Sequence, residues 1–233
     1  MSGLRPATRA DLRALPVEVA PRLLGGVLQT TVAGERVAVR ITEVEAYHGL
    51  GMGPVADPGS HARMGATPRN ATMWGEAGHL YVYLSHGIHS CVNVVAGPEG
   101  VAGGGILLRA GEVIEGTDAA TARRLQRRGA VRTPRDLAAG PGRLGDALGL
   151  QHPIHDGIDA IDGVEQAGAV ARLFLAPPVT EVATGPRVGV AGVAGTEAFP
   201  WRFWIPGDAT VSAFRWGRGA REAAAEEAAR GPC

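Results

Sequence analysis

The chain has 233 residues, of which 45% are hydrophobic, and its 23 basic and 23 acidic side chains cancel to a formal net charge of zero. This length and apolar content support one domain with its own core, and the neutral sum argues against a protein that is basic throughout, as many nucleic-acid binders are. Every basic residue is an arginine, since the sequence contains no lysine, so no side-chain amine is available for Schiff-base chemistry.

The sequence also indicates where in the cell the protein is expected. No apolar run reaches the length of a membrane span, and the arginine-containing N-terminus lacks the apolar stretch of a secretory signal. The two cysteines, Cys91 and Cys233, have no nearby partner in sequence. We therefore expect a cytoplasmic protein with no membrane partner.

The arginines are unevenly distributed along the chain. Between Thr121 and Arg143, seven arginines accompany a single acid, Asp136, so the local net charge is +6. Such a run is more often a solvated helix face, but it is also a candidate surface for phosphate groups. The seven are Arg123, Arg124, Arg127, Arg128, Arg132, Arg135 and Arg143.

Taken in chain order, the first predicted elements are short helices within residues 10–24, where apolar residues at helical spacing are interrupted by two prolines. Residues 26–31 and 36–46 flank Ala33-Gly34-Glu35, which predicts a β-hairpin. Apolar side chains occupy every second position up to Ile41, and continuing this alternation places Glu43, Glu45 and Tyr47 on the apolar face. Carboxylates on the apolar face of a strand indicate a functional site, because a buried charge is costly. The alternative is that the end of this strand is exposed to solvent. Alternation alone does not distinguish these two interpretations.

Two segments after this strand, a long loop and a predicted hairpin, contain candidate site residues. Residues 48–71 are rich in glycine, proline and small residues, and a loop of that length in a compact domain is often functional. It would present His61 and Arg63, although a single loop histidine is more often merely solvated. Residues 79–84 and 88–95 flank Ser85-His86-Gly87, which predicts a second hairpin whose tip carries His86. Tyr81 and Tyr83 share one face of it, as core residues or as part of a site.

The remaining elements are predicted more simply. Residues 105–110 are typical of a buried strand with Arg109 near its end, residues 113–125 of an amphipathic segment, and residues 143–150 of a short helix. Further strands are predicted within 164–184, 186–193, 201–205 and 211–214. We expect a single domain over residues 1–217 and an alanine- and glutamate-rich tail over residues 218–233 that is a frayed helix or disordered.

Six motifs in sequence are more specific than any of these patterns. They are TEVEAY, SHARMGATPRN, LYVYLSHGIHSCVN, ILLRA, AGPGRLGDALGL and GPRVGVAG followed by PWRFW, which together extend from about Leu23 to Phe214. In this order they resemble the alkyladenine (3-methyladenine) DNA glycosylase family. The resemblance implies an α+β fold, a single mixed domain around a curved antiparallel β-sheet with peripheral helices, and neither a metal nor a cofactor.

The same resemblance implies a function. The family flips alkylated or deaminated purines out of duplex DNA, because the glycosidic bond cannot be reached within the base stack, and hydrolyses that bond. The expected substrates are 3-methyladenine, 7-methylguanine, hypoxanthine and ethenoadenine, and the expected partner is double-stranded DNA with damaged purines. We expect a monomer, associated with the nucleoid if it is bacterial. Without a lysine, the enzyme is expected to leave an intact abasic site and to lack lyase activity.

Residue by residue, the resemblance assigns roles to positions of this sequence. Glu45 matches the catalytic glutamate, which implies that it activates a water molecule for attack on C1′. Arg109 matches an arginine that holds the DNA backbone near the flipped nucleotide. Asn93 matches an asparagine at the pocket floor that excludes the exocyclic amine of guanine. The base pocket is expected from Tyr47, His61, Tyr83 and Asn93, and DNA contacts from Arg69, His86 and Arg109. Arg143, from the arginine run, is also expected to contact DNA.

Two positions depart from the family pattern. His86 stands where a tyrosine usually occupies the hairpin tip and fills the gap left by the flipped base, and a histidine is smaller and more polar. Ala66 stands where an arginine is common, which removes a potential phosphate contact. A protein that binds damaged DNA or extrahelical bases without catalysis is therefore the main alternative.

A third hypothesis is a carbohydrate hydrolase that uses Glu43, Glu45 and Asp57 as its acids. The sequence lacks the tryptophan-rich platform expected for sugar binding.

Overall fold

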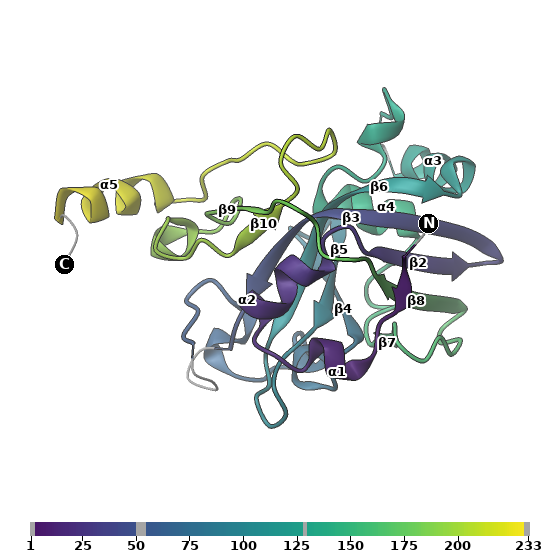
Figure 1. The fold of residues 1–233 in the computed structure, drawn as a ribbon, viewed down its shortest axis with the longest axis horizontal. Coiled ribbons are helices and arrows are strands. Elements are labelled where there is room, and N and C mark those ends of the chain that lie inside the picture. The colour runs from purple at the N-terminus through teal and green to yellow at the C-terminus, as the bar shows by residue number, and fades with distance from the viewer. Residues whose placement is uncertain (1–2, 50–54, 128–129, 231–233) are drawn as a thin grey trace.

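A long central strand, β3 (Glu35–Tyr47), organises the molecule. In the computed structural model, which describes residues 3–49, 55–127 and 130–230, β3 pairs along one side with β6 (Gly105–Glu115). Its other side pairs with β2 (Val27–Val32) over the first half and with β10 (Arg202–Trp204) over the second half. The C-terminal half of β3 thus lies between strands from distant parts of the chain (Figure 1).

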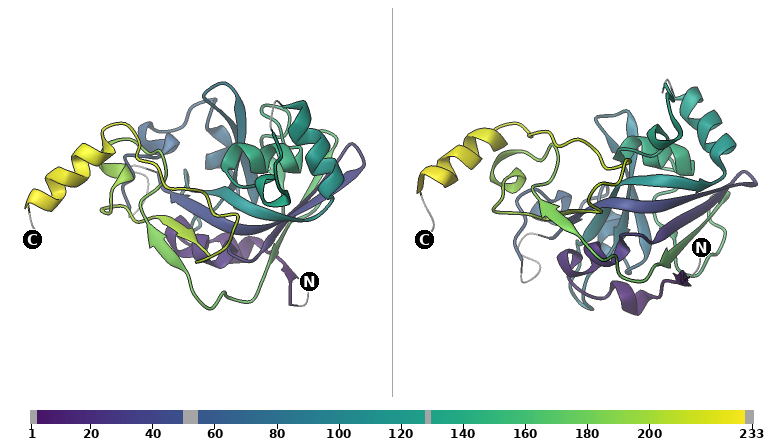
Figure 2. Two further views of the ribbon diagram at one scale, coloured as in Figure 1. Left: turned by 90° about the horizontal axis from the view of Figure 1, so that it is seen from above. Right: turned by 45° about the horizontal axis from the view of Figure 1, so that its top comes forward.

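All strand pairs of the ten-stranded sheet are antiparallel, and its main path follows the order β1-β8-β2-β3-β6-β5-β4-β7. The sheet is strongly curved, as the two views of Figure 2 show. The predicted α+β fold around a curved antiparallel sheet is therefore confirmed. The other strands are β1 (Arg5–Pro6), β4 (His79–Ser85), β5 (His89–Val95), β7 (Ile158–Asp159), β8 (Ala169–Leu175) and β9 (Ala183–Gly185).

Short helices cover the sheet on both sides (Figures 1 and 2). On one side lie α1 (Arg9–Leu12), α2 (Pro16–Val19) and the 3₁₀ turn η1 (Ala20–Leu23), and on the other α3 (Thr117–Gln126) and α4 (Pro141–Leu148). Leu12, Leu23, Leu144 and Leu148 of these helices are fully buried, and each such side chain contributes about 1.5–3 kcal/mol of transfer free energy. Short 3₁₀ turns complete the set, namely η2 (His61–Met64), η3 (Ala71–Trp74), η4 (Pro134–Asp136) and η5 (Gly192–Gly195).

Both predicted hairpins are confirmed. The turn between β2 and β3 has positive φ at Ala33 and Gly34, and the tip between β4 and β5 has positive φ at His86 and Gly87. Tight hairpin turns need this left-handed backbone, which glycine adopts freely and histidine more readily than most residues. His86 is consequently held at the exposed end of the β4–β5 hairpin.

The alternation predicted for β3 is wrong beyond Ile41. The pairing of β3 with β6 shifts register on either side of Glu43, which is the signature of β-bulges. Core residues of β3 are odd-numbered up to Ile41 but even-numbered afterwards, at Val44 and Ala46. Because a bulge changes the phase of a strand, Glu43 and Glu45 leave the apolar face and meet polar groups of neighbouring segments instead.

Two predicted strands are also corrected. Residues 186–193 form no strand, because Gly189 and Gly192 adopt positive φ and redirect the chain into η5. Residues 211–214 run as irregular chain rather than as a strand. In the C-terminal tail the described residues form helix α5 (Ala220–Arg230), which extends away from the sheet (Figure 1) while Ala220 at its start is buried.

The arginine run between residues 121 and 143 is not one phosphate-facing strip. Arg124 is buried in an ion pair with Asp146 at 3.0 Å, and Arg123 donates to backbone carbonyls of Val32 and Ala147. Burial lowers the pKa of Arg123, and the negative charge of Glu35 partly offsets this decrease. Arg128 lies outside the described residues. Within the part of the chain that the structure describes, no helix combines the length and apolar character needed to cross a membrane.

Candidate active site in an arginine-rich groove

A large open groove of about 1410 Å³ lies over the C-terminal half of β3. Its lining comes from β3, β6, the β4–β5 hairpin, the loop that follows β3, and two C-terminal segments around residues 188–191 and 215–218. Among the described residues, the lining includes Pro141 of α4 but not Arg143, which instead lies 3.5 Å from Asp136 in an ion pair. The other residues predicted for the site all line this groove: Glu45, Tyr47, His61, Arg69, Tyr83, His86, Asn93 and Arg109.

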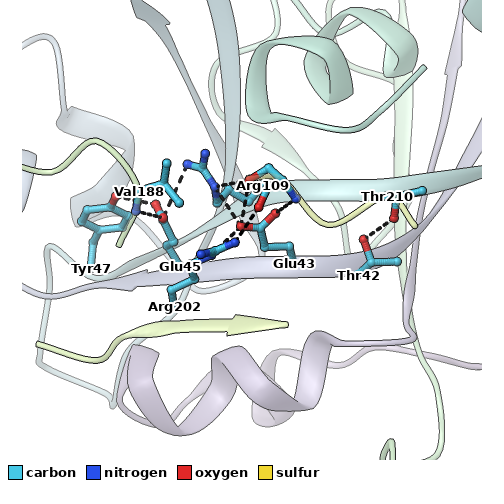
Figure 3. Close-up of polar contacts among 9 residues, drawn as sticks. Thr42, Glu43, Glu45, Tyr47, Arg109, Val188, Arg202 and Thr210 are labelled. Carbon is cyan, nitrogen blue, oxygen red and sulfur yellow. Dashed lines mark hydrogen bonds and ion pairs between the residues drawn. The ribbon is translucent and has the colours of Figure 1, made fainter. Parts of the chain in front are cut away.

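Glu45 lies in the lining of the groove, and its side chain is fully buried. Figure 3 shows its polar contacts. The backbone N–H of Val188 donates to Oε1 at 2.6 Å, and the hydroxyl of Tyr47 donates to Oε2 at 2.8 Å. Nη1 of Arg109 lies 3.4 Å from the same Oε1. A buried carboxylate is costly unless donors and an opposite charge surround it. These three groups supply both, and they fix the carboxylate in one orientation as an acceptor.

The Tyr47 hydroxyl is a permanent donor in this arrangement. Burial raises its pKa well above the usual value, and the negative charge of Glu45 raises it further. The phenol therefore stays protonated at neutral pH and continues to donate to Glu45. Behind the ring, the guanidinium of Arg187 stacks at 4.5 Å from its centroid and holds the ring in place.

Glu43, two residues earlier, is enclosed in a network of donors (Figure 3). Its Oε1 accepts from Nε of Arg202 at 2.6 Å and from Nε of Arg109 at 3.0 Å, and Ser212 donates through its backbone N–H and its hydroxyl. The side chain is fully buried. Glu43 thus joins β3, β6, β10 and the C-terminal segment, and it is not among the described residues that line the groove.

Arg109 connects the two glutamates. Burial lowers its pKa, but Glu45 and Glu43 outweigh burial, so the net pKa is raised and the guanidinium is always charged. The family resemblance implies that this residue contacts the DNA backbone. The structure places it within the groove lining, with one nitrogen on Glu43 and another close to Glu45.

Aromatic rings form the wall provided by the hairpin. Tyr81 and Tyr83 stack with centroids 5.4 Å apart, and the ring of His61 meets Tyr83 edge-on at 4.6 Å. Nδ1 of His61 also lies 3.2 Å from the Tyr81 hydroxyl. Partial burial lowers the pKa of His61, and the positive charges of Arg69 and Arg63 lower it further. A neutral imidazole therefore faces the groove at neutral pH.

The remaining predicted residues occupy distinct parts of the same groove. Asn93 is buried, and its amide nitrogen donates to the backbone carbonyl of Tyr81 at 3.0 Å. Arg69 is exposed and makes one long contact, 3.4 Å, to the carbonyl of Leu84. His86 is exposed at the hairpin tip, where Nδ1 lies 3.0 Å from the Ser85 hydroxyl.

Cys91 is a buried free thiol in the groove lining. Burial raises its pKa to about 11, although contacts with Tyr83, Arg109 and Ser85 act in the other direction. At neutral pH it is a thiol rather than a thiolate, so it is a poor nucleophile and a poor metal ligand. Cys233 lies outside the described residues, and among those described no group of three or more acidic, histidine or cysteine side chains is arranged to hold a metal ion.

A buried ion pair fixes the loop that follows β3. Both terminal guanidinium nitrogens of Arg187, Nη1 and Nη2, donate to Asp57, at 2.7 and 2.8 Å, and they also donate to the carbonyls of Ala46 and Ala194. Asp57 additionally accepts from the backbone N–H of His48. Neither charged side chain of the pair has any exposed surface. Asp57 is therefore committed to the framework, as Glu43 is, and of the three acids considered for a carbohydrate hydrolase only Glu45 lines the groove.

The lining of the groove is strongly positive although the chain is neutral. Five arginines line it, and Glu45 is the one acid that does so among the described residues. Such a concentration of positive charge in a groove attracts polyanions. The five arginines are Arg63, Arg69, Arg109, Arg215 and Arg218.

Sequence reasoning missed several residues that build this site. Val188 and Ser212 act through backbone N–H groups, for which the side-chain pattern carries no signal. Arg202 could have been noticed, because an arginine within the otherwise aromatic strand sequence Trp-Arg-Phe-Trp needs a buried partner. Arg187, which follows Pro186, could have been noticed for the same reason, because it too needs a buried partner.

The fold and the groove together define a single-domain α+β protein in which one oriented carboxylate lies among aromatic rings and arginines. Residues 10–209 match the model of the Methylpurine-DNA glycosylase (MPG) family. The chain is 48% identical to a protein of Leifsonia xyli subsp. xyli over 202 residues, which is 87% of this chain and 89% of that protein.

Two further relatives are similar over comparable lengths. A protein of Nocardia farcinica is 48% identical over 86% of this chain and 87% of its own length, and one of Streptomyces avermitilis is 45% identical over 90% and 92%. All three relatives are provisionally named 3-methyladenine DNA glycosylases. The chain therefore belongs to the methylpurine-DNA glycosylase family.

Proposed function

We propose that this protein is a monofunctional DNA glycosylase of base-excision repair, which removes alkylated or deaminated purines and acts as a monomer. The observation that carries the proposal is the orientation of Glu45 in the lining of a positively charged groove. In the proposed reaction, the carboxylate accepts a proton from a water molecule while the water oxygen attacks C1′ of the flipped nucleotide. The bond from C1′ to the purine nitrogen breaks, and its electron pair leaves with the base.

The surroundings of Glu45 suit this chemistry. Among the described residues, its oxygens accept hydrogen bonds from Tyr47 and Val188 and pair with the guanidinium of Arg109, so the carboxylate is positioned before the substrate arrives and needs little reorganisation. A negative carboxylate also stabilises the positive charge that develops on the sugar. A purine methylated at N3 or N7 is cationic, and its departure as a neutral base makes it a good leaving group.

The aromatic wall supports the choice of substrate class. The stacked rings of Tyr81 and Tyr83, together with neutral His61, offer π-faces and edges beside the carboxylate. Electron-rich rings attract a cationic purine more strongly than a neutral one. Asn93, fixed by its bond to Tyr81, is proposed to limit access by the exocyclic amine of guanine.

The test is release of free base from duplex oligonucleotides that carry hypoxanthine or ethenoadenine, and from methylated DNA. We expect released base and an abasic strand that breaks only after treatment with alkali. Reduction with borohydride during the reaction should trap no covalent protein–DNA adduct, because the chain has no lysine. An adduct would contradict the monofunctional assignment, and binding without release would favour a damage-recognition protein.

The histidine at the hairpin tip provides a further prediction. We propose that His86 occupies the gap left by the flipped nucleotide and stacks there less well than a larger aromatic ring. His86→Tyr is therefore expected to stabilise the flipped state by ~1 kcal/mol, which corresponds to about a fivefold gain in affinity for lesion-containing duplex. Titration of fluorescent duplex with both proteins measures this difference, with undamaged duplex as the control. A variant that binds and cleaves no better than wild type would show that the tip does not fill the gap.

A further inference from the structure

The groove has a second wall, formed by residues 211–219 between β10 and α5, which we call the wall segment. Arg215, Trp216 and Arg218 line the groove from this segment. It lies outside the region matched by the family model, which ends at residue 209. In Figure 1 the chain runs through it from β10 toward α5.

The wall segment is attached firmly to the catalytic framework. At one end, Ser212 donates twice to Glu43 and accepts from Arg202 through its carbonyl at 2.7 Å. Further along, Gly189 and Gly192 donate through their backbone N–H groups to the carbonyls of Arg215 and Arg218. Gly217 packs directly against the backbone of Val190. A Cβ atom at position 217 would lie 2.0 Å from the carbonyl oxygen of Val190. The segment is therefore positioned before any ligand binds.

Its side chains have the character of a nucleic-acid surface. Trp216 is 42% exposed and Phe214 36% exposed, and their rings meet edge-to-face at 4.9 Å. Large aromatic rings at the surface indicate an interaction site. Arginines on either side of an aromatic ring suit a strand of DNA, because the phosphates meet the guanidinium groups while a base or sugar packs against the ring.

We infer that the wall segment binds duplex DNA beside the flipped nucleotide, on the side of the groove formed by residues 188–191. This inference rests on the proposed function, which makes DNA the ligand of the groove. Charge complementarity supports DNA over an apolar or basic partner, since the groove lining contains five arginines and one acid among the described residues. Trp216 supplies the packing surface, Phe214 supports its ring, and Arg215 and Arg218 supply the phosphate contacts.

The test measures affinity for a fluorescent duplex that contains a reduced abasic site, at several salt concentrations. Trp216→Ala is expected to weaken binding about tenfold, because stacking on one aromatic ring is lost. Arg215→Ala combined with Arg218→Ala should lower the slope of log K against log salt concentration by about 2, which corresponds to two phosphate contacts. Arg36→Ala, at the start of β3 and outside the groove lining, is the matched control and should bind as wild type.

The outcomes separate this inference from the proposed function. If both sets of wall-segment variants keep the affinity and salt slope of the Arg36→Ala control, while wild type releases base, the wall segment is not a DNA contact and the proposed function stands. If wild type releases no base from any damaged duplex, the proposed function fails whatever the variants do. Circular dichroism of each variant establishes that weakened binding does not result from unfolding.

Discussion

Replacing Glu45 with glutamine is expected to reduce the single-turnover rate of base release by about 10²–10⁴-fold, the usual contribution of a positioned general base. Glutamine has the same shape and can still accept from the backbone N–H of Val188. It cannot take a proton from water, and it carries no negative charge to stabilise the sugar. Binding of lesion-containing duplex should therefore change little while the chemistry almost stops.

Glu43 provides a contrast within the same strand. Glu43→Gln removes the charge that faces Arg202 and Arg109 in a fully buried network, and loss of one partner from such a network costs about 3–5 kcal/mol of folding free energy. Urea denaturation of both variants, alongside rapid-quench measurement of base release, distinguishes the two roles. Glu45→Gln should unfold near the wild-type midpoint, whereas Glu43→Gln should unfold at lower urea. A Glu45→Gln protein that releases base at the wild-type rate would contradict the proposed mechanism.

The hairpins show what local sequence can predict. Ala33-Gly34 and His86-Gly87 need only a turn geometry set by their own backbones, and both turns occur where the pattern placed them. The phase of β3 could not be predicted in this way. Its bulge depends on the pairing with β6, which is far away in sequence, so alternation carried past Ile41 assigned the two glutamates to the wrong face.

The site shows the same division between local and distant information. Motifs in the sequence were sufficient to select Glu45, Tyr47 and Arg109, which lie together in the structure. Arg143 was selected by charge, but it lies on α4 beside Asp136 and does not line the groove among the described residues. The charge of an arginine does not reveal where its side chain points, because the side chain can extend to solvent or pair with an acid from another element.

The groups that hold the candidate catalytic residues were the least predictable. They are backbone donors and buried arginines that belong to segments about 140 to 170 residues after β3. Their contacts exist only once β10 and the irregular C-terminal chain have folded onto the strand. The arrangement makes the chemistry of Glu45 depend on the packing of distant segments, and the Asp57–Arg187 pair provides a direct test of that dependence.

Removing either partner of the buried Asp57–Arg187 pair is expected to destabilise the protein by about 3–5 kcal/mol, because the remaining charge would be buried without compensation. Asp57→Asn leaves the guanidinium of Arg187 without its carboxylate, and Arg187→Met leaves the carboxylate of Asp57 with the backbone donors of His48 and Gly59. A loss of this size is a large part of the 5–15 kcal/mol that typically separates folded from unfolded chains. Both variants should therefore unfold at much lower urea concentrations than wild type.

The double variant Asp57→Asn, Arg187→Met completes a thermodynamic cycle. Its loss of stability should be smaller than the sum of the two single losses, because it leaves no uncompensated charge. The exposed pair of Arg5 and Asp11, at 2.6 Å, is the matched control, and Arg5→Ala should shift the urea midpoint far less since solvent screens that pair. Additive losses in the cycle would mean that the two side chains act independently. Because Arg187 also stacks behind Tyr47, the Arg187→Met variant should lose base release as well, even under conditions in which it remains folded.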